Sequence, residues 1–352
     1  MIAEPIQIKR ILIDKTPILA ERMVELQYKR QPELWRPFGS RERELSVRDA
    51  EFHIPFLAEA VFIEEQSIFT NYVRWTKKLF KGLNFPDGAM IIILECMQEA
   101  ITEELGDEDS RIIGEYIDAA IDVMKEPLEE SLSFIDINEP HGKLALDYNR
   151  ALLDGNRRLA SELILTNVEN GVEIKDIYLN VFQKSQYEIG RLWLENKITV
   201  AKEHFCSAAT QQIMSQLYPY IFSTERIGKT MIAANVGKEL HEIGIRMVAD
   251  FFEMEGWDTY YLGANTPARS IIQAVEDNEA SIIGLSVAMP YHISALREAI
   301  DDIRNRFNDK VKIMIGGYAL KEYGDKWNQF NADGYAANAL DAIELAQQLT
   351  AS

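Results

Sequence analysis

Residues 230–244 read TMIAANVGKELHEIG and decide the fold of the C-terminal third of the chain. The stretch opens with a short apolar run of strand length, and apolar side chains return at helical spacing after the loop. The loop holds one early glycine and lacks the G-x-G-x-x-G fingerprint of a dinucleotide site. His241 stands at the junction of loop and helix, with Glu239 two residues before it and Gly244 three after. The stretch therefore predicts a strand–loop–helix unit with a histidine at its ligand-binding end.

The alternation of strand and helix continues to the end of the chain. After Thr230–Asn235, the strand candidates are Asp258–Leu262, Ser281–Val287, Val311–Ile315 and a short Asp333–Ala336, and helical runs at 242–255, 267–278, 291–306 and 338–350 separate them. Such alternation with right-handed crossovers gives an open parallel sheet covered on both faces. Ligands bind at the carboxyl ends of the strands of such sheets. We therefore predict a doubly wound, Rossmann-like domain over residues 226–352.

The sequence before residue 226 is helical, with apolar residues three and four positions apart. The polar, proline-containing stretch FIDINEP at 134–140 marks a boundary within it. Four helical stretches with short turns follow, which is the pattern of an antiparallel four-helix bundle. We predict an α + α/β protein with a helical sensory or interaction domain at 1–138, a four-helix-bundle cap at 139–225 and the α/β domain at 226–352.

Composition narrows the classes of function. The 352 residues are 47% hydrophobic and 26% charged, which is typical of a globular protein. The net charge of −19 repels a phosphate backbone, so we expect no direct contact with nucleic acid. The chain has two cysteines and no apolar run of about 18 residues, so neither a disulfide framework nor a membrane span is expected. A cytoplasmic protein is the expectation.

His241 and Glu239 carry the chemistry of the first loop. As a ligand, His241 would present one ring nitrogen to a metal, while Glu239 accepts a hydrogen bond from the other nitrogen and fixes the tautomer. Gly244 would let a bulky planar group approach the backbone. The alternative is an ordinary surface histidine at the start of a helix.

Small residues occupy the ends of the third and fourth strands. Ser286 and Val287 end the third strand, and Gly316 and Gly317 follow the fourth. Small side chains there would open a groove between the strands, and the Ser286 hydroxyl could bond a buried heterocycle. Each feature alone is an ordinary α/β loop, but together, in this order, they indicate one ligand site.

The order Glu-x-His-x-x-Gly, Ser-x-Ala, Gly-Gly resembles the base-off/His-on cobalamin-binding domain shared by methionine synthase, methylmalonyl-CoA mutase and corrinoid carriers. The resemblance covers roughly residues 229–350. It implies that His241 is the lower axial ligand of cobalt and that the dimethylbenzimidazole tail lies along the serine and the paired glycines. The chain departs from the family at Ala288, where leucine or threonine is usual. At Glu239 most of the enzymes have aspartate, and the light-sensing branch has glutamate.

A second signature, W-x9-E-H, lies in the helical region just before this domain and consists of Trp193, Glu203 and His204. It resembles the cap of the CarH/LitR-type adenosylcobalamin photoreceptors. The resemblance implies that Trp193 packs against the 5′-deoxyadenosyl group and that Glu203 bonds its ribose. Leu194 replaces the histidine that captures cobalt after illumination in that family, so His204 or water would take the upper site. The alternative is a core tryptophan beside a solvated helix edge.

The N-terminal region places His53, Tyr72 and Arg74 among aromatic residues at helical spacing. Such a set could line a pocket for an elongated conjugated ligand whose propionates pair with arginine. The region resembles the helical sensory part of photocobilins, which implies biliverdin or another bilin as a second chromophore. The alternatives are ordinary helical core and a dimerisation or partner-docking module. We expect a homodimer.

These observations predict a light-responsive regulator, not an enzyme, with adenosylcobalamin between the bundle and the sheet. Photolysis of the Co–C bond would rearrange the cap and the N-terminal domain and so signal to a downstream protein partner. The alternative is a corrinoid methyl-carrier protein of a methyltransferase system, which would use the same His241. A cobalamin-storage protein or a sensor that does not respond to light is a third class.

Overall fold

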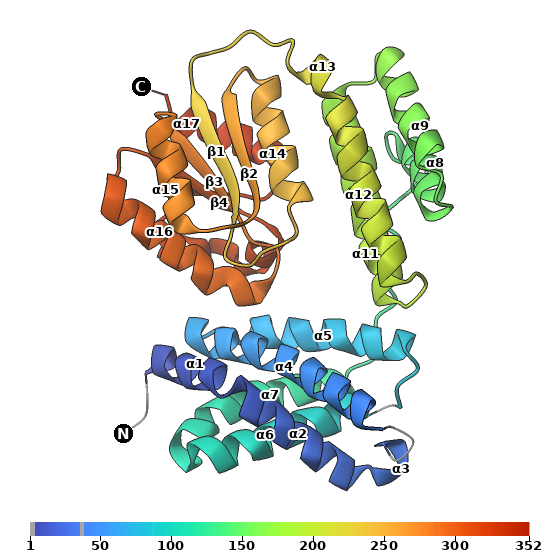
Figure 1. Cartoon of the computed structure of the whole chain (residues 1–352), viewed down its shortest axis with the longest axis vertical. Coiled ribbons are helices and arrows are strands. Elements are labelled where there is room, and N and C mark those ends of the chain that lie inside the picture. Colours follow the sequence, from blue (N-terminus) through green and yellow to red (C-terminus); the bar gives the residue numbers. More distant parts are fainter. Residues whose placement is uncertain (1–3, 36–38, 87, 352) are drawn as a thin grey trace. The chain divides into compact units, whose positions relative to one another are not determined.

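The computed structural model describes residues 4–35, 39–86 and 88–351, which form two compact units (Figure 1). The first unit takes the chain to Glu130 and includes residues 194–197. The second unit contains residues 131–193 and 198–352. The helical bundle and the sheet therefore belong to one compact unit. In the described residues, no helix combines the length and apolar character needed to cross a bilayer.

The regular structure of the first unit is helical in its described residues (Figure 1). Its helices are α1 (Pro5–Asp14), α2 (Thr16–Arg30), α3 (Pro32–Trp35), α4 (Ser40–Ile63), α5 (Gln66–Gly82), α6 (Ala89–Leu105) and α7 (Asp107–Lys125). Helix α4 packs against α1 and α2, and α6 packs against α2 and α7. The apolar spacing explains this packing, because α2 buries Leu19, Met23 and Leu26 on one face.

The second unit begins with the predicted bundle. Its helices are α8 (Gly142–Leu153), α9 (Arg157–Glu169), the short α10 (Ile174–Asp176), the π-helical η1 (Ile177–Gln183), α11 (Lys184–Leu194), α12 (Val200–Gln216) and α13 (Tyr218–Ile221). Side-chain caps start two of them: Asn156 accepts a hydrogen bond from the backbone of Leu159, and Thr199 accepts one from Lys202. The π-helical turn is of a kind that often occurs at functional sites.

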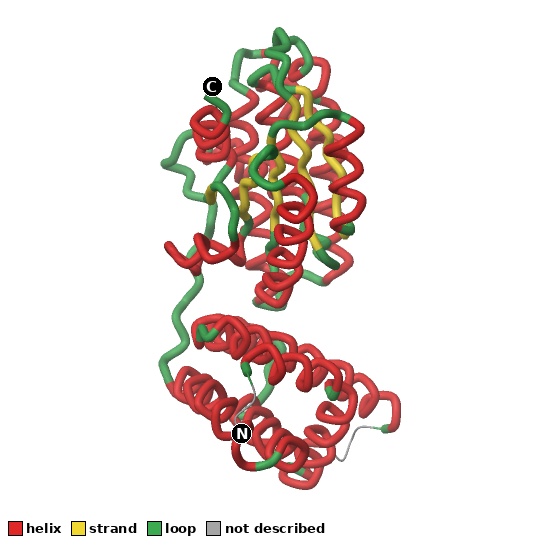
Figure 2. Tube along the Cα trace, turned by 90° about the vertical axis from the view of Figure 1, so that its left-hand side faces the viewer, coloured by secondary structure: helices red, strands yellow, loops and turns green. Residues whose placement is uncertain are grey.

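The rest of the second unit is the doubly wound α/β domain, so the predicted fold class is confirmed. Its strands are β1 (Thr230–Val236), β2 (Asp258–Thr266), β3 (Ile282–Ser286), β4 (Lys312–Gly316) and β5 (Gly334–Ala336), and they pair in parallel in the order β2-β1-β3-β4-β5. Between them run α14 (Ile243–Met254), α15 (Ala268–Asp277), the short η2 (Pro290–His292), α16 (Ile293–Phe307), η3 (Tyr318–Phe330) and α17 (Ala339–Leu349). Figure 2 shows helices on both sides of the strands.

The strand register aligns one row of residues at the carboxyl end of the sheet. Asn235 of β1 pairs with Ser286 of β3, which pairs with Gly316 of β4. Because strand side chains alternate between faces, this row shares its face with Met231 and Ala233. That face packs against α14 and α17 in one core cluster. The row therefore lies at the ligand-binding edge, beneath two helices.

The bundle and the sheet share this core through α14. Phe251 and Phe252 of α14 are fully buried in the cluster that also contains Tyr178 and Phe182 of the bundle. A polar contact joins the same elements: the Tyr178 hydroxyl donates to Asp250 over 2.7 Å. Burial raises the pKa of Asp250 to about 6. The Tyr178 hydroxyl thus supplies a hydrogen bond to a carboxyl group that is shielded from water.

We expect Tyr178→Phe to lower the free energy of unfolding of the second unit by about 1–3 kcal/mol, because it removes one of the hydrogen bonds that satisfy the buried Asp250 carboxyl. Urea unfolding of the full chain, followed by circular dichroism, measures this change. Tyr220→Phe, at a ring that is 40% exposed, is the matched control and should change little. An equal effect of both substitutions would contradict the assigned role of the contact.

Candidate functional site

The loop between β1 and α14 turns sharply at Gly237. Its φ of +61° lies in the left-handed region, and a Cβ there would stand 2.9 Å from the Cβ of Ala295. A side chain at this position would therefore be strained and crowded. The turn carries the chain over the carboxyl end of the sheet before α14 begins, and Glu239 and His241 lie in this loop.

Glu239 is the centre of the loop, with 1% of its side chain exposed. Its Oε1 accepts hydrogen bonds from the backbone N–H groups of Leu240 (2.9 Å) and His241 (3.0 Å). Its Oε2 accepts from the backbone N–H groups of Ala288 and Met289, each over 2.8 Å. The carboxylate thus joins the loop after β1 to the loop after β3.

Two imidazoles complete the surroundings of this carboxylate. Nδ1 of His241 lies 2.6 Å from Oε1 of Glu239, and Nδ1 of His292 lies 3.3 Å from Oε2. Burial alone would raise the pKa of Glu239, but the hydrogen bonds from His241 and His292 hold it well below its usual range. Glu239 is therefore an anion that keeps a proton on Nδ1 of His241.

His241 is held on one side and accessible on the other. Its side chain is 65% exposed although Nδ1 is bonded to Glu239. With the proton on Nδ1, the lone pair lies on Nε2, which is the form in which imidazole binds metals. The hydrogen bond to Glu239 raises the pKa of His241 and burial opposes it, and the charge of Glu203 adds to the rise. The bundle therefore brings a carboxylate toward this ring.

Close backbone packing requires glycine at positions 316 and 317, in addition to the ligand-binding role that the resemblance implies for this pair. Gly317 has a φ of +105°, and a Cβ there would stand 2.1 Å from the carbonyl oxygen of Val287. A Cβ at Gly316 would stand 2.9 Å from the carbonyl oxygen of Ala336. The loops after β3 and β4 thus pack backbone to backbone. A Cβ at Gly244 would meet nothing within 4 Å, so that position is open.

The bundle residues of the W-x9-E-H signature lie on α11 and α12. Trp193 is partly buried near the end of α11, and Glu203 in the first turn of α12 has 26% of its side chain exposed. Nδ1 of the exposed His204 hydrogen-bonds Glu203, and Ser207 donates to Glu203 over 2.8 Å. The roles of these residues toward an upper ligand stay predictions.

Sequence reasoning missed several residues that surround this site. His292 lies in a 3₁₀ turn after β3, four residues beyond the Ser-x-Ala motif but not part of it. In the bundle, Gln186 lies 3.1 Å from the Ser207 hydroxyl and donates to Thr210 over 2.9 Å. Asn235 carried a signal that could have been used, because it is an amide inside an otherwise apolar strand.

The three N-terminal candidates are only partly brought together. Nδ1 of His53 lies 2.7 Å from the Tyr72 hydroxyl, and both side chains are buried. Burial lowers the pKa of His53 to about 4, so this ring is neutral near pH 7. Arg74 does not join them: it bonds Asn71 and Glu126 and is 48% exposed. The geometric reason is that Arg74, two positions after Tyr72 on one helix, points about 200° around the axis.

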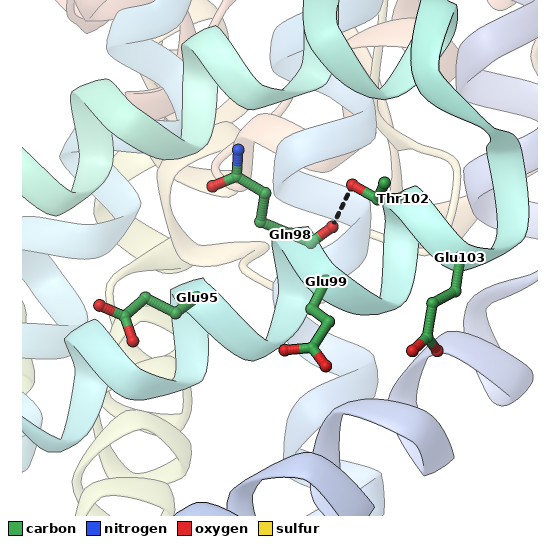
Figure 3. A pocket seen from close by; sticks show the side chains of 5 residues that line it. All are labelled: Glu95, Gln98, Glu99, Thr102 and Glu103. Atoms are coloured by element: carbon green, nitrogen blue, oxygen red, sulfur yellow. Dashed lines mark hydrogen bonds between the residues drawn. The ribbon is translucent and has the colours of Figure 1, made fainter.

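An open hollow in the first unit is lined by one face of α6 (Figure 3). Its acidic side chains are already paired, because Glu95 and Glu99 bond Arg30 and Glu103 bonds Arg22. Thr102 bonds the backbone of Gln98. This row of charges therefore ties α6 to α2.

Comparisons with known proteins bear on all three regions. Residues 229–344 match the B12 binding domain family, and residues 144–218 match a second B12 binding domain family. This chain is a cobalamin-binding protein. Residues 3–124 match the phycobilisome protein family.

Curated relatives of this cobalamin-binding protein are corrinoid proteins. Dimethylamine corrinoid protein 3 of Methanosarcina mazei is 29% identical over 168 residues, covering 47% of this chain and 96% of the relative. A corrinoid protein of Desulfitobacterium hafniense is 23% identical over 210 residues, covering 58% and 95%. The solved monomethylamine corrinoid protein of Methanosarcina barkeri aligns with a TM-score of 0.54 at 20% identity, covering 60% of this chain and all of that one. At this identity, the structural similarity shows a common fold.

The residues present fit a corrinoid. A single accessible imidazole, oriented by a buried anion, is a suitable fifth ligand for a metal whose other ligands come with the cofactor. At the carboxyl end of β1, the strand that leads into the His241 loop, Asn235 is fully buried, and neither its amide nitrogen nor its amide oxygen has a hydrogen-bond partner. An orphaned polar group at the ligand-binding edge is explained if a ligand group bonds it.

We expect Glu239→Gln to weaken cobalamin binding about 10- to 100-fold, because an amide cannot serve both imidazoles and four backbone N–H groups as the carboxylate does. Titration of the full chain with cobalamin, followed by absorption, measures the affinity. Glu162→Gln, at an exposed carboxylate of α9, is the control. Unchanged affinity in Glu239→Gln would contradict a supporting role for this carboxylate.

We expect His53 to make the first unit less stable in acid. Its pKa is lower in the folded chain than the usual 6.5, so the unfolded chain binds the extra proton. The stability is therefore complete above about pH 6.5 and falls by about 2–3 kcal/mol as the pH approaches 4. Urea unfolding of the full chain at several pH values measures the slope.

His53→Phe should flatten this part of the pH profile, while His141→Gln, at a partly exposed histidine, should leave it unchanged. A profile that His53→Phe does not alter would show that other groups cause the loss of stability in acid.

Proposed function

We propose that the chain is a corrinoid carrier that holds cobalamin in its base-off form, with Nε2 of His241 as the lower axial ligand. The observation that carries this proposal is the pair of His241 and Glu239, in which a buried anion fixes the tautomer of an accessible imidazole. The matches to B12 binding domains over residues 229–344 and 144–218 support it.

In this function, the chain's own residues would hold the metal ligand His241 in a fixed orientation. Glu239 keeps the proton at Nδ1 of His241, and the backbone N–H groups of Ala288 and Met289 keep Glu239 in place. Bound cobalamin supplies a cobalt–carbon bond that can be broken and formed again. Helices α11 and α12 would shield the upper face from water, and α12 contributes Glu203, whose charge acts on His241 in addition to that of Glu239.

The group carried is proposed to be methyl. The relatives named as dimethylamine corrinoid proteins support this, because they match about half of this chain. In this function a separate methyltransferase delivers or removes the methyl group, and the chain is its carrier subunit. The comparisons favour this function, given above as the alternative, over light-responsive regulation.

A second function is favoured by the N-terminal unit. Residues 3–124 match a family named for the phycobilisome, and the same region resembles the helical sensory part of photocobilins, as described above. A methyl carrier does not need such a unit. With adenosylcobalamin as the bound form, Trp193 and Glu203 would contact the adenosyl group, and a bilin in the first unit would be a second chromophore. The chain would then be a light-responsive regulator acting through a protein partner, for which a homodimer is a suitable form.

The two functions predict different results for the full chain reconstituted in the dark with methylcobalamin or adenosylcobalamin. A methyl carrier binds both forms with similar affinity and keeps the same sedimentation coefficient after illumination. A light-responsive regulator prefers the adenosyl form, loses that preference in Trp193→Ala, and changes its sedimentation coefficient with light. Biliverdin added to the same sample should give a visible band that survives desalting only in the second case.

His241→Ala separates both functions from adventitious binding. In either function this variant loses the His-on absorption spectrum, because the imidazole is the lower ligand. A spectrum identical to that of the unmodified chain would exclude both.

A further inference from the structure

Asn235 lies near the carboxyl end of β1 and has an amide without a hydrogen-bond partner. It is fully buried, and both its amide nitrogen and its amide oxygen are unpaired. The residues before it in β1 from Met231 to Ala234, and Ile282–Leu285 of the neighbouring β3, carry no polar side chain. Since buried polar groups in native proteins are nearly always paired, this amide is expected to meet its partner in a bound state.

The residues around Asn235 at the carboxyl end of the sheet are small or polar. Asn235 lies beside Ser286 in the register of β1 and β3, and Gly316 follows in β4. One level deeper on the same face are Ala233 and Gly284. A Cβ at Gly284 would stand 2.4 Å from Cε of Met231, so the Met231 side chain packs over this glycine. This face of the sheet packs against α14, the helix that follows the His241 loop.

The proposed base-off binding determines which part of a corrinoid would meet Asn235. When an imidazole of the protein binds the lower face of cobalt, the nucleotide base that otherwise binds there is released as a tail. On the resemblance described above, that tail lies along Ser286 and the paired glycines. The tail base is then the group that Asn235 would meet.

The hydrogen-bonding capacity of the amide selects among tail bases. Nδ2 donates and Oδ1 accepts, so complete pairing needs an acceptor and a donor side by side. Adenine offers this edge, with an exocyclic amine that donates next to a ring nitrogen that accepts, and asparagine pairs with adenine in two-bond fashion in other complexes. Dimethylbenzimidazole offers one acceptor nitrogen and no donor, so it would leave Oδ1 unpaired.

We propose that Asn235 makes this chain prefer corrinoids whose lower nucleotide carries a purine with an adjacent donor and acceptor, adenine being the simplest, over those with dimethylbenzimidazole. Ser286, whose hydroxyl can donate or accept, adds a further bond to the same base. The inference rests on the proposed base-off binding and specifies the class of corrinoid that it takes.

The test is the affinity of the full chain for three probes: an adenine-tailed cobamide, cobalamin, and cobinamide, which has no tail base. Absorption titration gives each dissociation constant. We expect the adenine-tailed form to bind about tenfold or more tightly than cobalamin, which corresponds to satisfying one additional buried group. Equal affinity for the two tailed forms would overturn the inference.

Two variants of Asn235 assign the preference to its amide. Asn235→Leu keeps the branched shape of the side chain without its polar atoms and should abolish the preference for adenine, and Asn235→Ala should do the same if the larger leucine disturbs folding. Asn167→Leu changes an amide of α9, away from the sheet, and should keep the preference. Retention of the preference in both Asn235 variants would also overturn the inference.

The thermal midpoint of the cofactor-free chain gives a readout independent of binding. Asn235→Leu should raise it, because the orphaned amide is removed, whereas a purely structural asparagine would make the variant less stable. Failure of the proposed base-off binding is recognised separately. In that case none of the probes binds, or His241→Ala leaves their binding unchanged.

Discussion

The site depends on one buried carboxylate. Glu239 accepts four backbone N–H groups and faces two imidazoles, and these partners come from the loops after β1 and β3. A charge with 1% exposure is tolerable only when it is fully hydrogen-bonded. Its environment therefore fixes the paths of both loops. The orientation of His241 follows from the same contacts, so the geometry of the metal ligand is a consequence of satisfying this anion.

Most of the fold was predictable because the spacing of apolar residues and the position of turn-forming residues determine helices and strands locally. The strand at Thr230–Asn235 and the helical run at 242–255 lie within one residue of β1 and α14 as observed. The strand expected at Asp258–Leu262 extends to Thr266, since pairing with β1 continues through irregularities in the register that no local pattern encodes. The π-helical turn at Ile177–Gln183 also has no sequence signature, because its apolar spacing resembles that of an α-helix.

The site was predictable where spacing along one loop determines contact, as for Glu239 and His241. It was not predictable where contact depends on how strands pair. His292 reaches Glu239 from 53 residues away, and the pairing of Asn235 with Ser286 follows from the register of β1 and β3. In the first unit, His53 and Tyr72 meet because two helices pack, while Arg74 points elsewhere on the same helix as Tyr72. The resemblance to cobalamin-binding domains indicated the cofactor. The neighbours of these residues are seen only in the three-dimensional structure.

The hydrogen bonds of Glu239 all go to groups of the protein itself, so none of them depends on an atom of a cofactor. A metal ligand that is oriented by such internal bonds is preorganised, and binding to it costs less conformational entropy than binding to a freely rotating side chain.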